Sequence, residues 1–356
     1  MLSIKIQLEG INEVKKILIE ENLFNKNYKI KTDDYYGFIP IKSQSNIKKL
    51  KIKLNEATNN DLYKIAIEDI DFEPFKKEPR SISEQLKGKL SDKEIKDLKT
   101  SFDIIGDLVL LEIPENLEKH KTIIGETTID FTKTRSVFMK KSGIKGLTRT
   151  REIELISGED NSKTTHKEHG IKLALDLKKV YFSPRLATER KRVEKEVEDG
   201  ELILDMFTGV GSFPILIAKN KNVEIYGVDI NEIAIDYFKE NIGINKLKGI
   251  VNPIYGDINN VAINFTSENL KFNRIIMNLP QTAYKFLDLA ISLIKNNGTI
   301  HYYEFANDYK IIIDRIKEVA INHDKKIEVL NKRRVKSKSP GIWHIGVDVK
   351  IINKAQ

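Results

Sequence analysis

Four positions in the second half of the chain carry side chains suited to ligand chemistry, and each follows a short apolar run. They are Asp205, Asp229 in Gly-Val-Asp-Ile-Asn, Asp257, and Asn278 in Asn-Leu-Pro. A carboxylate at the end of a second strand can accept hydrogen bonds from both ribose hydroxyls, and one at the end of a third could accept from an adenine amino group. Alone, each residue is better explained as a solvated strand end. Together, at this spacing, they predict a nucleoside-binding site.

Two glycines follow the first of these positions, in Asp205-Met-Phe-Thr-Gly-Val-Gly-Ser-Phe. Gly209 and Gly211 would let the backbone approach a ligand closely, where a strand turns into a helix. No Lys-Ser/Thr pair follows them, so the segment is not a Walker loop, and Pro214 stands where a dinucleotide fingerprint has its third glycine. The pattern therefore favours a nucleoside over a nucleotide phosphate.

The elements that position these residues are apolar runs of strand length that alternate with helical patterns. The predicted strands cover 202–207, 224–230, 252–258, 274–280 and 299–305. Such alternation implies a parallel sheet wrapped by helices. Two further strand patterns, in 326–336 and 344–352, are separated only by a basic loop. They predict an antiparallel hairpin at one edge of the sheet.

This part of the chain, 200–356, resembles the class I S-adenosylmethionine-dependent methyltransferases, through D-x-F-x-G-x-G at 205–211 and N-L-P at 278–280. The resemblance implies an α/β fold, a Rossmann-like seven-stranded sheet with a reversed last strand. It also implies S-adenosylmethionine as the methyl donor, with no metal. Asp205 would lie near the amino group of the donor's methionine part. The donor-binding residues implied are Arg190, Asp205, Phe207, Gly209, Gly211, Asp229, Ile230, Asp257 and Asn278.

The fourth motif and the cysteine count narrow the target atom. Methylation of exocyclic amines in this class typically uses Asn/Asp-Pro-Pro-aromatic, a pattern that Leu279 and Gln281 break. The related 5-methylcytosine RNA enzymes need cysteine nucleophiles, and the chain has no cysteine. A ring nitrogen, or another target that needs no covalent intermediate, remains.

Length and composition set the wider frame. The chain has 356 residues, of which 40% are hydrophobic and 31% charged, as expected of a folded protein of two or three domains. Absent cysteine also excludes disulfides and thiolate metal sites. No uncharged run is long enough for a membrane span, and the charged amino terminus is not a signal peptide. We therefore expect a soluble cytosolic protein.

The expected domains follow from shifts in pattern. Residues 1–72 are predicted to form a small α/β domain, and 73–99, with two prolines and many charges, a mobile linker with one or two short helices. Residues 100–182 are predicted to form a mixed, strand-rich domain. Residues 183–356 form the sheet domain described above.

The net charge of +8 is concentrated between Thr132 and Arg151, where no acidic residue occurs. The tail at 331–343 adds five more basic residues beside the single tryptophan. Phosphate backbones are the favoured partner, against the alternative of a solvated basic loop. The basic residues of the first segment are Lys133, Arg135, Lys140, Lys141, Lys145, Arg149 and Arg151.

Longer motifs resemble the archaeal and eukaryal tRNA guanine-37 N1-methyltransferase family, which includes relatives from the wyosine pathway. The matching segments are 141–160 with R-x-R-E-I-E, TTHKEHG at 164–170, and KVYFSPRLATERKRV at 179–193. The match runs from a strand–helix unit ending near FIPI at 38–41 to N-L-P and HYYEF at 301–305. It implies a first domain that senses the outer corner of tRNA, a second that grips the RNA, and a third that binds the donor. We expect a monomer that binds tRNA and no membrane.

The chemistry of guanine N1 defines the roles that this family resemblance assigns. N1 carries a proton whose pKa is well above neutrality, so transfer is helped by a base at N1–H and a cation near O6. By resemblance, Glu189 is the general base and Arg149 the cation. Asn278 and Pro280 would shape the guanine pocket, and Tyr181 would position the guanine or the donor.

Several of these residues have competing interpretations. From pattern alone, Glu189 is better read as a surface helix residue paired with Arg185 or Arg192. Arg151 competes with Arg149, which we prefer because the match places the first arginine at the active site. Arg190 could contact the donor carboxylate or a phosphate.

The spacing of His166 and His169, H-x-x-H, lacks a third metal ligand of convincing spacing. We therefore interpret this pair as structural or RNA-contacting rather than as metal ligands.

Three functions compete. The first is N1 methylation of guanine 37. The second is a wyosine-pathway transfer at the same tRNA position, either C7 methylation of the tricyclic base or aminocarboxypropyl transfer. The third is a non-catalytic RNA-binding module. Intact N-L-P and Glu189 favour the first over the second, and the intact donor motifs argue against the third.

Overall fold

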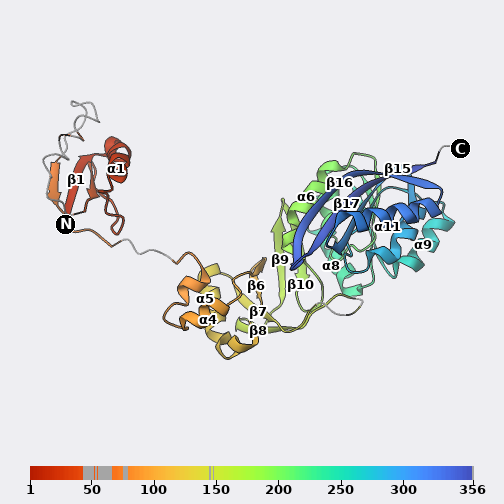
Figure 1. Cartoon of the computed structure of the whole chain (residues 1–356), viewed down its shortest axis with the longest axis horizontal. Coiled ribbons are helices and arrows are strands. Elements are labelled where there is room, and N and C mark those ends of the chain that lie inside the picture. Colours follow the sequence, from red (N-terminus) through yellow and green to blue (C-terminus); the bar gives the residue numbers. More distant parts are fainter. Residues whose placement is uncertain are drawn as a thin grey trace. The chain divides into compact units, whose positions relative to one another are not determined.

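The computed structural model describes residues 1–42, 52, 54, 66–74, 79–143, 146 and 148–354. The chain divides into two compact units, Met1–Arg80 and Ser81–Gln356 (Figure 1). We call them the N-terminal unit and the C-terminal unit and describe each by itself. Lys145 of the predicted basic segment lies outside the described residues.

The N-terminal unit contains a small antiparallel sheet and the helix α1. Its strands, in the order β2-β3-β1-β4, surround a core to which the helix contributes Val14 and Leu18. Leu8, directly after β1, lies exposed in a short 3-10 turn. The elements are β1 (Leu2–Gln7), α1 (Ile11–Glu20), β2 (Lys31–Thr32), β3 (Tyr36–Pro40) and β4 (Ala66–Asp69).

The C-terminal unit begins with two short helices and a four-stranded sheet in the order β5-β6-β7-β8. Only β6 and β7 pair in parallel, because α5 connects them. The elements are α3 (Ile82–Gln85), α4 (Asp92–Asp97), β5 (Asp103–Ile105), β6 (Leu108–Leu111), α5 (Lys121–Thr132), β7 (Ser136–Lys140) and β8 (Ile153–Gly158).

The second part of the expected linker 73–99, from Ile82 onward, packs against the C-terminal unit. Ile82, Leu86 and Leu90 are buried in one core cluster with residues of β6, α5 and β7. Ser91 begins α4 with a capping box, in which its side chain and that of Glu94 each bond the other's backbone N–H. These residues therefore belong to the C-terminal unit rather than to a mobile connection.

A two-stranded hairpin, β9 (Lys163–Glu168) and β10 (Ile171–Asp176), follows the four-stranded sheet. Buried residues from both parts hold that sheet against the rest of the unit: Phe138 of β7 and Leu175 of β10 share one cluster with Val210 and Ala234. An ion pair between Arg185 and Asp103 crosses the same boundary.

The larger sheet has seven strands in the order β13-β12-β11-β14-β15-β17-β16. The first five are parallel, whereas β17 runs antiparallel to both of its neighbours. The predicted α/β fold with a reversed last strand and an edge hairpin is confirmed. The strands are β11 (Leu202–Asp205), β12 (Glu224–Asp229), β13 (Ile250–Tyr255), β14 (Phe272–Met277), β15 (Ile294–Ala306), β16 (Lys325–Ser339) and β17 (Ile342–Asn353).

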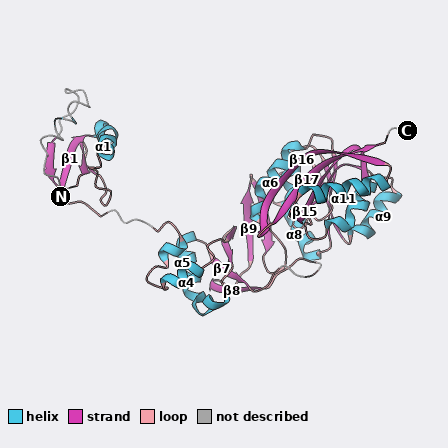
Figure 2. Ribbon diagram, in the orientation of Figure 1, coloured by secondary structure: helices cyan, strands magenta, loops and turns pink. Residues whose placement is uncertain are grey.

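Helices cover both faces of this sheet (Figure 2). One face buries apolar residues of α9, α10 and α11, and the other those of α6, α7 and α8. Helices thus shield apolar side chains on both faces of the sheet from water, as expected of a parallel sheet. The helices are α6 (Ala187–Glu196), α7 (Ser212–Asn220), α8 (Glu232–Gly243), α9 (Ile258–Ser267), α10 (Leu287–Leu293) and α11 (Tyr309–Asn322).

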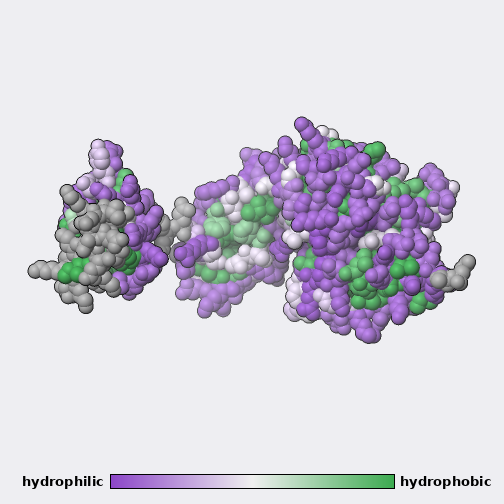
Figure 3. Space-filling view, turned by 90° about the horizontal axis from the view of Figure 1, so that it is seen from above, coloured by the Kyte–Doolittle hydropathy of each residue, from purple (hydrophilic) through white to green (hydrophobic). Residues whose placement is uncertain are grey.

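Hydrophilic side chains predominate on the face of the C-terminal unit that Figure 3 shows, with smaller hydrophobic areas between them. Within the described residues, no helix is both long and apolar enough to cross a lipid bilayer.

Candidate active site

A cavity of about 460 Å³ lies at the carboxyl ends of the central strands, where open α/β sheets bind ligands. It extends to the segment that connects β7 and β8, so residues far apart in sequence share one wall. Of the predicted site residues, those that line it are Arg149, Tyr181, Arg190, Phe207, Gly209, Asp229, Ile230, Asp257 and Asn278. Glu189, Asp205, Gly211 and Pro280 are not among its lining residues.

Asp205, the last residue of β11, is buried directly behind the cavity wall. Its side chain is 1% exposed, and its Oδ2 has no hydrogen-bond partner among the described residues. Burial raises the pKa of Asp205 to about 7, because a low-dielectric surrounding disfavours the charged form. An unpartnered buried carboxyl oxygen is suited to a cationic group of a ligand.

The two glycines after β11 have different surroundings. Gly209 has φ +56°, lines the cavity, and a Cβ there would meet only the carbonyl oxygen of Tyr181, at 3.9 Å. Gly211 has φ +83° and begins α7, and a Cβ there would overlap the ring of Phe238. Gly209 therefore keeps space open on the ligand side, whereas Gly211 allows close packing between α7 and α8.

Asp229 ends β12 and is fixed by two backbone N–H groups. Gly209 donates to its Oδ2 at 2.7 Å and Asn231 to its Oδ1 at 2.9 Å. Burial raises the pKa of Asp229, and these hydrogen bonds oppose the rise. Asp257 follows β13 and caps α9 by accepting from the backbone N–H of Asn259 at 2.8 Å. Both carboxylates are thus held rigidly at the cavity.

Arg149 reaches the cavity from the connection between β7 and β8. Its backbone is left-handed, with φ +55°, an uncommon conformation for a residue other than glycine. The guanidinium carbon lies 4.7 Å from the centroid of the Tyr181 ring, and Nε is buried without a hydrogen-bond partner in the described part of the chain. Burial lowers the pKa of Arg149. An unsatisfied cationic donor in a cavity is suited to an anionic or carbonyl oxygen of a ligand.

The Asn-Leu-Pro segment follows β14 and turns sharply. The carbonyl of Leu279 accepts from the N–H groups of Thr282 and Ala283, and that of Pro280 accepts from Phe305 at 2.9 Å. Asn278 is left at the cavity wall, half-buried. Pro280 thus fixes the turn rather than lining the cavity.

Glu189 lies on the first turn of α6, between the cavity-lining residues Leu186 and Arg190 in sequence, and is 6% exposed. It forms ion pairs with Arg192, one of the two partners expected for a surface helix residue, and with Arg333 of β16, which the sequence did not indicate. Arg185 pairs with Asp103 instead. Burial alone would raise the pKa of Glu189, but the hydrogen bonds from Arg333 and Arg192 outweigh it and lower the pKa to about 2. The carboxylate is therefore ionised at neutral pH.

Arg190 lines the cavity but does not offer a free charge. It is 2% exposed, and its Nε and Nη2 donate to the two oxygens of Glu168 at 2.5 and 2.6 Å. Neither a phosphate nor a donor carboxylate is needed to satisfy it. This bidentate ion pair instead joins α6 to β9.

The H-x-x-H pair also has structural partners. His166 Nδ1 accepts from the backbone N–H of Gly106 at 3.2 Å, and His169 donates to the carbonyl of Ala187 at 2.9 Å. The two rings therefore bind different segments and converge on no common point.

Three of the six described basic residues at 132–151 form ion pairs, although the segment itself contains no acidic residue. Arg135 pairs with Asp107 and Glu159, and Lys141 with Glu118 and Glu154. Lys140 pairs with Asp103. Carboxylates from elsewhere in the C-terminal unit therefore neutralise these three cations of the segment.

Two residues around Glu189, Arg333 and Tyr303, were missed in the sequence. Both lie in strands that were predicted, in NKRRVK and HYYEF. The pairing of the two hairpin strands could have indicated Arg333. Alternate residues of a strand share one face, so only one of the adjacent Arg333 and Arg334 can point toward α6.

Comparisons with known proteins agree with this geometry. Three family profiles match: "TRM5/TYW2 methyltransferase domain" at 164–330, "TYW2 N-terminal domain" at 82–161 and "tRNA methyltransferase 5 N-terminal domain" at 3–49. The tRNA (guanine(37)-N(1))-methyltransferase Trm5b of Pyrococcus abyssi is 38% identical over 98% of this chain and 99% of its own. The Methanocaldococcus jannaschii enzyme of the same name is 37% identical over 99% of both chains.

Solved structures give the same result. The crystal structure of Pyrococcus abyssi Trm5b has a TM-score of 0.80 over 99% of both chains, at 38% identity. A structure titled as the complex of aTrm5 and tRNALeu has a TM-score of 0.80, at 38% identity, over 99% of this chain and 100% of its own. A more distant relative, the tRNA(Phe) (4-demethylwyosine(37)-C(7)) aminocarboxypropyltransferase of Methanocaldococcus jannaschii, is 31% identical over 70% of this chain and 97% of its own.

Proposed function

Because the chain belongs to the TRM5/TYW2 methyltransferase family, we propose that it transfers the methyl group of S-adenosylmethionine to N1 of guanosine 37 in tRNA. One observation carries the proposal from the residues themselves. The guanidinium of Arg149, stacked on Tyr181 and unpartnered at Nε, enters the same cavity as the strand-end carboxylates. The cation and the carboxylates suited to a nucleoside therefore line the same cavity.

The donor fits the strand-end half of the cavity. Asp229, held by two N–H groups, has the chemistry to accept from ribose hydroxyls, and Asp257 could accept from the adenine amino group. Phe207 and Ile230 supply apolar contacts. Asp205, with its orphaned oxygen, would pair with the amino group of the methionine part. When bound, the donor supplies a methyl group on a sulfonium as the electrophile.

The target base would enter the other half of the cavity. Arg149 would donate to guanine O6, where negative charge develops as N1 loses its proton. Tyr181 orients that guanidinium through its ring. Asn278, held at the wall by the turn of Pro280, would bound the guanine pocket.

Glu189 is the proposed general base. Of its two oxygens, Oε1 accepts from three side chains, whereas the only hydrogen bond to Oε2 in the described residues is from Arg333, at 3.0 Å. Oε2 thus keeps the capacity to accept the N1 proton. In the proposed step, the N1–H proton passes to this carboxylate and the N1 electron pair forms the bond to the methyl carbon. The bond between sulfur and that carbon breaks, its electron pair stays on sulfur, and S-adenosylhomocysteine leaves. The step needs no cysteine and no metal.

The proposed partner is tRNA, bound by the chain as a monomer. Supporting this, the Trm5 relative solved with tRNALeu matches the chain over nearly all of its length. By the same relationship, the N-terminal unit would sense the outer corner of the tRNA, and the four-stranded sheet of the C-terminal unit would help to grip the anticodon loop.

Wyosine-pathway transfer is less well supported. The aminocarboxypropyltransferase relative covers less of this chain and is less similar than the two guanine-37 enzymes.

The test is to incubate the purified chain and S-adenosylmethionine with a tRNA transcript bearing guanosine 37, and with tRNA bearing 4-demethylwyosine, followed by mass spectrometry of the nucleosides. We expect 1-methylguanosine from the first and no mass increase in the second. A methyl or aminocarboxypropyl adduct only on the wyosine base would replace the proposal by the second function.

A further inference from the structure

Glu189 accepts hydrogen bonds from two strands, β15 and β16, and from its own helix. Its Oε1 accepts from the hydroxyl of Tyr303 at 2.6 Å, from Arg192 at 2.8 Å, and from Nη2 of Arg333. Arg333 is the only one of these that also donates to Oε2, through Nε at 3.0 Å. Among the described residues, this one guanidinium thus holds both oxygens of the carboxylate.

Arg333 reaches Glu189 by lying across the neighbouring strand. In the register of the hairpin it is opposite Gly346 of β17. A Cβ at position 346 would lie 3.0 Å from Nη2 and 3.1 Å from Cζ of Arg333, and 3.1 Å from Cε1 of Tyr303. Glycine at 346 therefore leaves the space in which the guanidinium lies.

A second carboxylate anchors the other side of the guanidinium. Nη1 of Arg333 donates to Oδ2 of Asp348 at 2.7 Å, and Asp348 is 1% exposed. Asp348 also accepts from Arg192, and its Oδ1 is hydrogen-bonded to Nδ1 of His301 at 2.7 Å. Arg333 is consequently fixed at both ends, which limits the rotamers of Glu189 as well.

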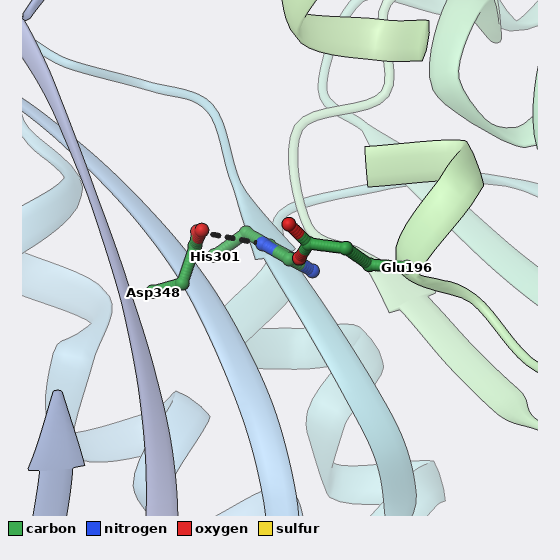
Figure 4. A group of neighbouring side chains, drawn as sticks. All are labelled: Glu196, His301 and Asp348. Carbon is green, nitrogen blue, oxygen red and sulfur yellow. Dashed lines mark hydrogen bonds and ion pairs between the residues drawn. The ribbon is translucent and has the colours of Figure 1, made fainter. Parts of the chain in front are cut away.

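The same cluster could be mistaken for a metal site, because Glu196, His301 and Asp348 present ligand atoms within 4.8 Å of one another (Figure 4). Arginines already occupy those atoms. Arg192 donates to Glu196 at 2.5 Å, and Nη1 of Arg274 lies 2.7 Å from His301 Nε2. Three guanidiniums at this point would repel a divalent cation, so the cluster is an ion-pair network that supports Arg333.

We propose that Arg333 is a positioning residue for the Glu189 carboxylate: it fixes the orientation that leaves Oε2 able to accept the N1 proton. The inference rests on the proposed role of Glu189 as the base. It assigns to the edge hairpin of the sheet a part in the chemistry, since Arg333 and Gly346 come from its two strands.

Removal of Arg333 has a defined effect on protonation. Burial raises the pKa of Glu189, and Arg333 is the largest of the interactions that lower it to about 2. Without Arg333 the pKa moves upward, so the base becomes protonated at a higher pH and the rate falls on the acid side. His344 does not confound this, because burial lowers its pKa to about 3 and it stays neutral above that pH. The charged or titratable groups that face Glu189 are Arg192 on α6, Arg333 on β16, Tyr303 on β15, and His344 and Asp348 on β17.

The experiment measures single-turnover methyl transfer to saturating guanosine-37 transcript and donor between pH 5 and 8, in the full chain. The readout is the ratio of the variant rate to the wild-type rate at each pH, so that titrations common to both cancel. For Arg333→Met we expect a ratio at least about threefold lower at pH 5 than at pH 7.5, since one pH unit below its pKa a base is about tenfold depleted. Arg333→Lys keeps the charge and should give a lower but pH-independent ratio.

Arg334→Met is the matched control, because Arg334 is on the same strand and stacks on Trp343, 4.7 Å from its ring centroid, away from Glu189. It removes the same charge, so we expect a similar change in tRNA affinity but a flat ratio. Should Arg333→Met fail to fold, Gly346→Ala displaces the guanidinium by a few tenths of an ångström without removing any charge. A smaller pH-dependent loss is expected there.

A flat ratio for both Arg333→Met and Gly346→Ala, or the same slope in Arg334→Met, would overturn the positioning role. Glu189→Gln separates this failure from that of the proposed base. If Glu189→Gln transfers methyl at the wild-type rate, the base assignment is wrong; if it is inactive while the Arg333 variants keep the wild-type pH profile, only the present inference fails.

Discussion

The two glycines of the first motif allow a paired prediction in which stability and donor binding separate. Gly211→Ala would place a Cβ 2.7 Å from Cγ of Phe238 and even closer to two other ring atoms, at φ +83°. A left-handed residue other than glycine costs about 1–2 kcal/mol, and overpacking a core costs about 1–3 kcal/mol. We therefore expect Gly211→Ala to lower the free energy of unfolding by about 2–5 kcal/mol.

Gly209→Ala should behave differently, because a Cβ there meets protein only at 3.9 Å. The backbone conformation alone costs about 1–2 kcal/mol, but the new methyl group enters the cavity that the donor is proposed to fill. We expect S-adenosylmethionine to bind at least about tenfold more weakly, equivalent to about 1.4 kcal/mol.

The assay combines thermal unfolding of both variants with calorimetric titration of the donor. In domains of this size, 1 kcal/mol corresponds to about 2–4 °C in Tm, so Gly211→Ala should melt well below Gly209→Ala. The reasoning is refuted if the two variants lose equal stability, or if Gly211→Ala weakens donor binding while its Tm is unchanged.

Three further predictions follow from the site. Since burial raises the pKa of Asp205 to about 7, pairing with the donor's ammonium must release a proton below that pH; calorimetry should show the donor Kd rising as pH falls from 7 to 5.5, and a flat profile for Asp205→Asn. Arg149→Met should lower kcat by about 100-fold or more with little change in tRNA Kd, whereas equal losses in Arg149→Met and Arg151→Met would contradict the choice between them. Arg190→Met removes the guanidinium that bonds both oxygens of the buried Glu168 and leaves His166 Nε2, 3.5 Å away, beside it, so chemical denaturation should show a loss of about 3–5 kcal/mol, which a second change, Glu168→Gln, should partly restore.

The sequence was sufficient for the parts of the molecule that depend on local pattern. Strand-length apolar runs that alternate with helical periodicity predicted the parallel sheet, and the short loop between the last two runs predicted the edge hairpin. Because the ends of parallel strands meet at one edge, Asp229, Asp257 and Asn278 could be expected to line one cavity, and they do.

Interactions between residues distant in sequence could not be predicted in this way. Arg135 pairs with Asp107 and Arg190 with Glu168, so cations that were expected to meet phosphates or the donor are satisfied within the chain. Glu189 and Arg333 are 144 positions apart, and only the register of the hairpin brings them together. Charge composition favoured a mobile linker with short helices at 73–99, but buried leucines of 82–98 pack that part of the segment into the core of the C-terminal unit.

The most direct test of the account is methyl transfer to three transcripts that differ only at position 37, carrying guanosine, inosine or adenosine. Guanine and hypoxanthine both present N1–H and O6, the two groups that Glu189 and Arg149 are proposed to contact, whereas adenine presents neither. The account predicts N1 methylation of guanosine and inosine and none of adenosine. Methylation of the adenosine transcript, or rejection of inosine together with full activity on guanosine, would contradict it.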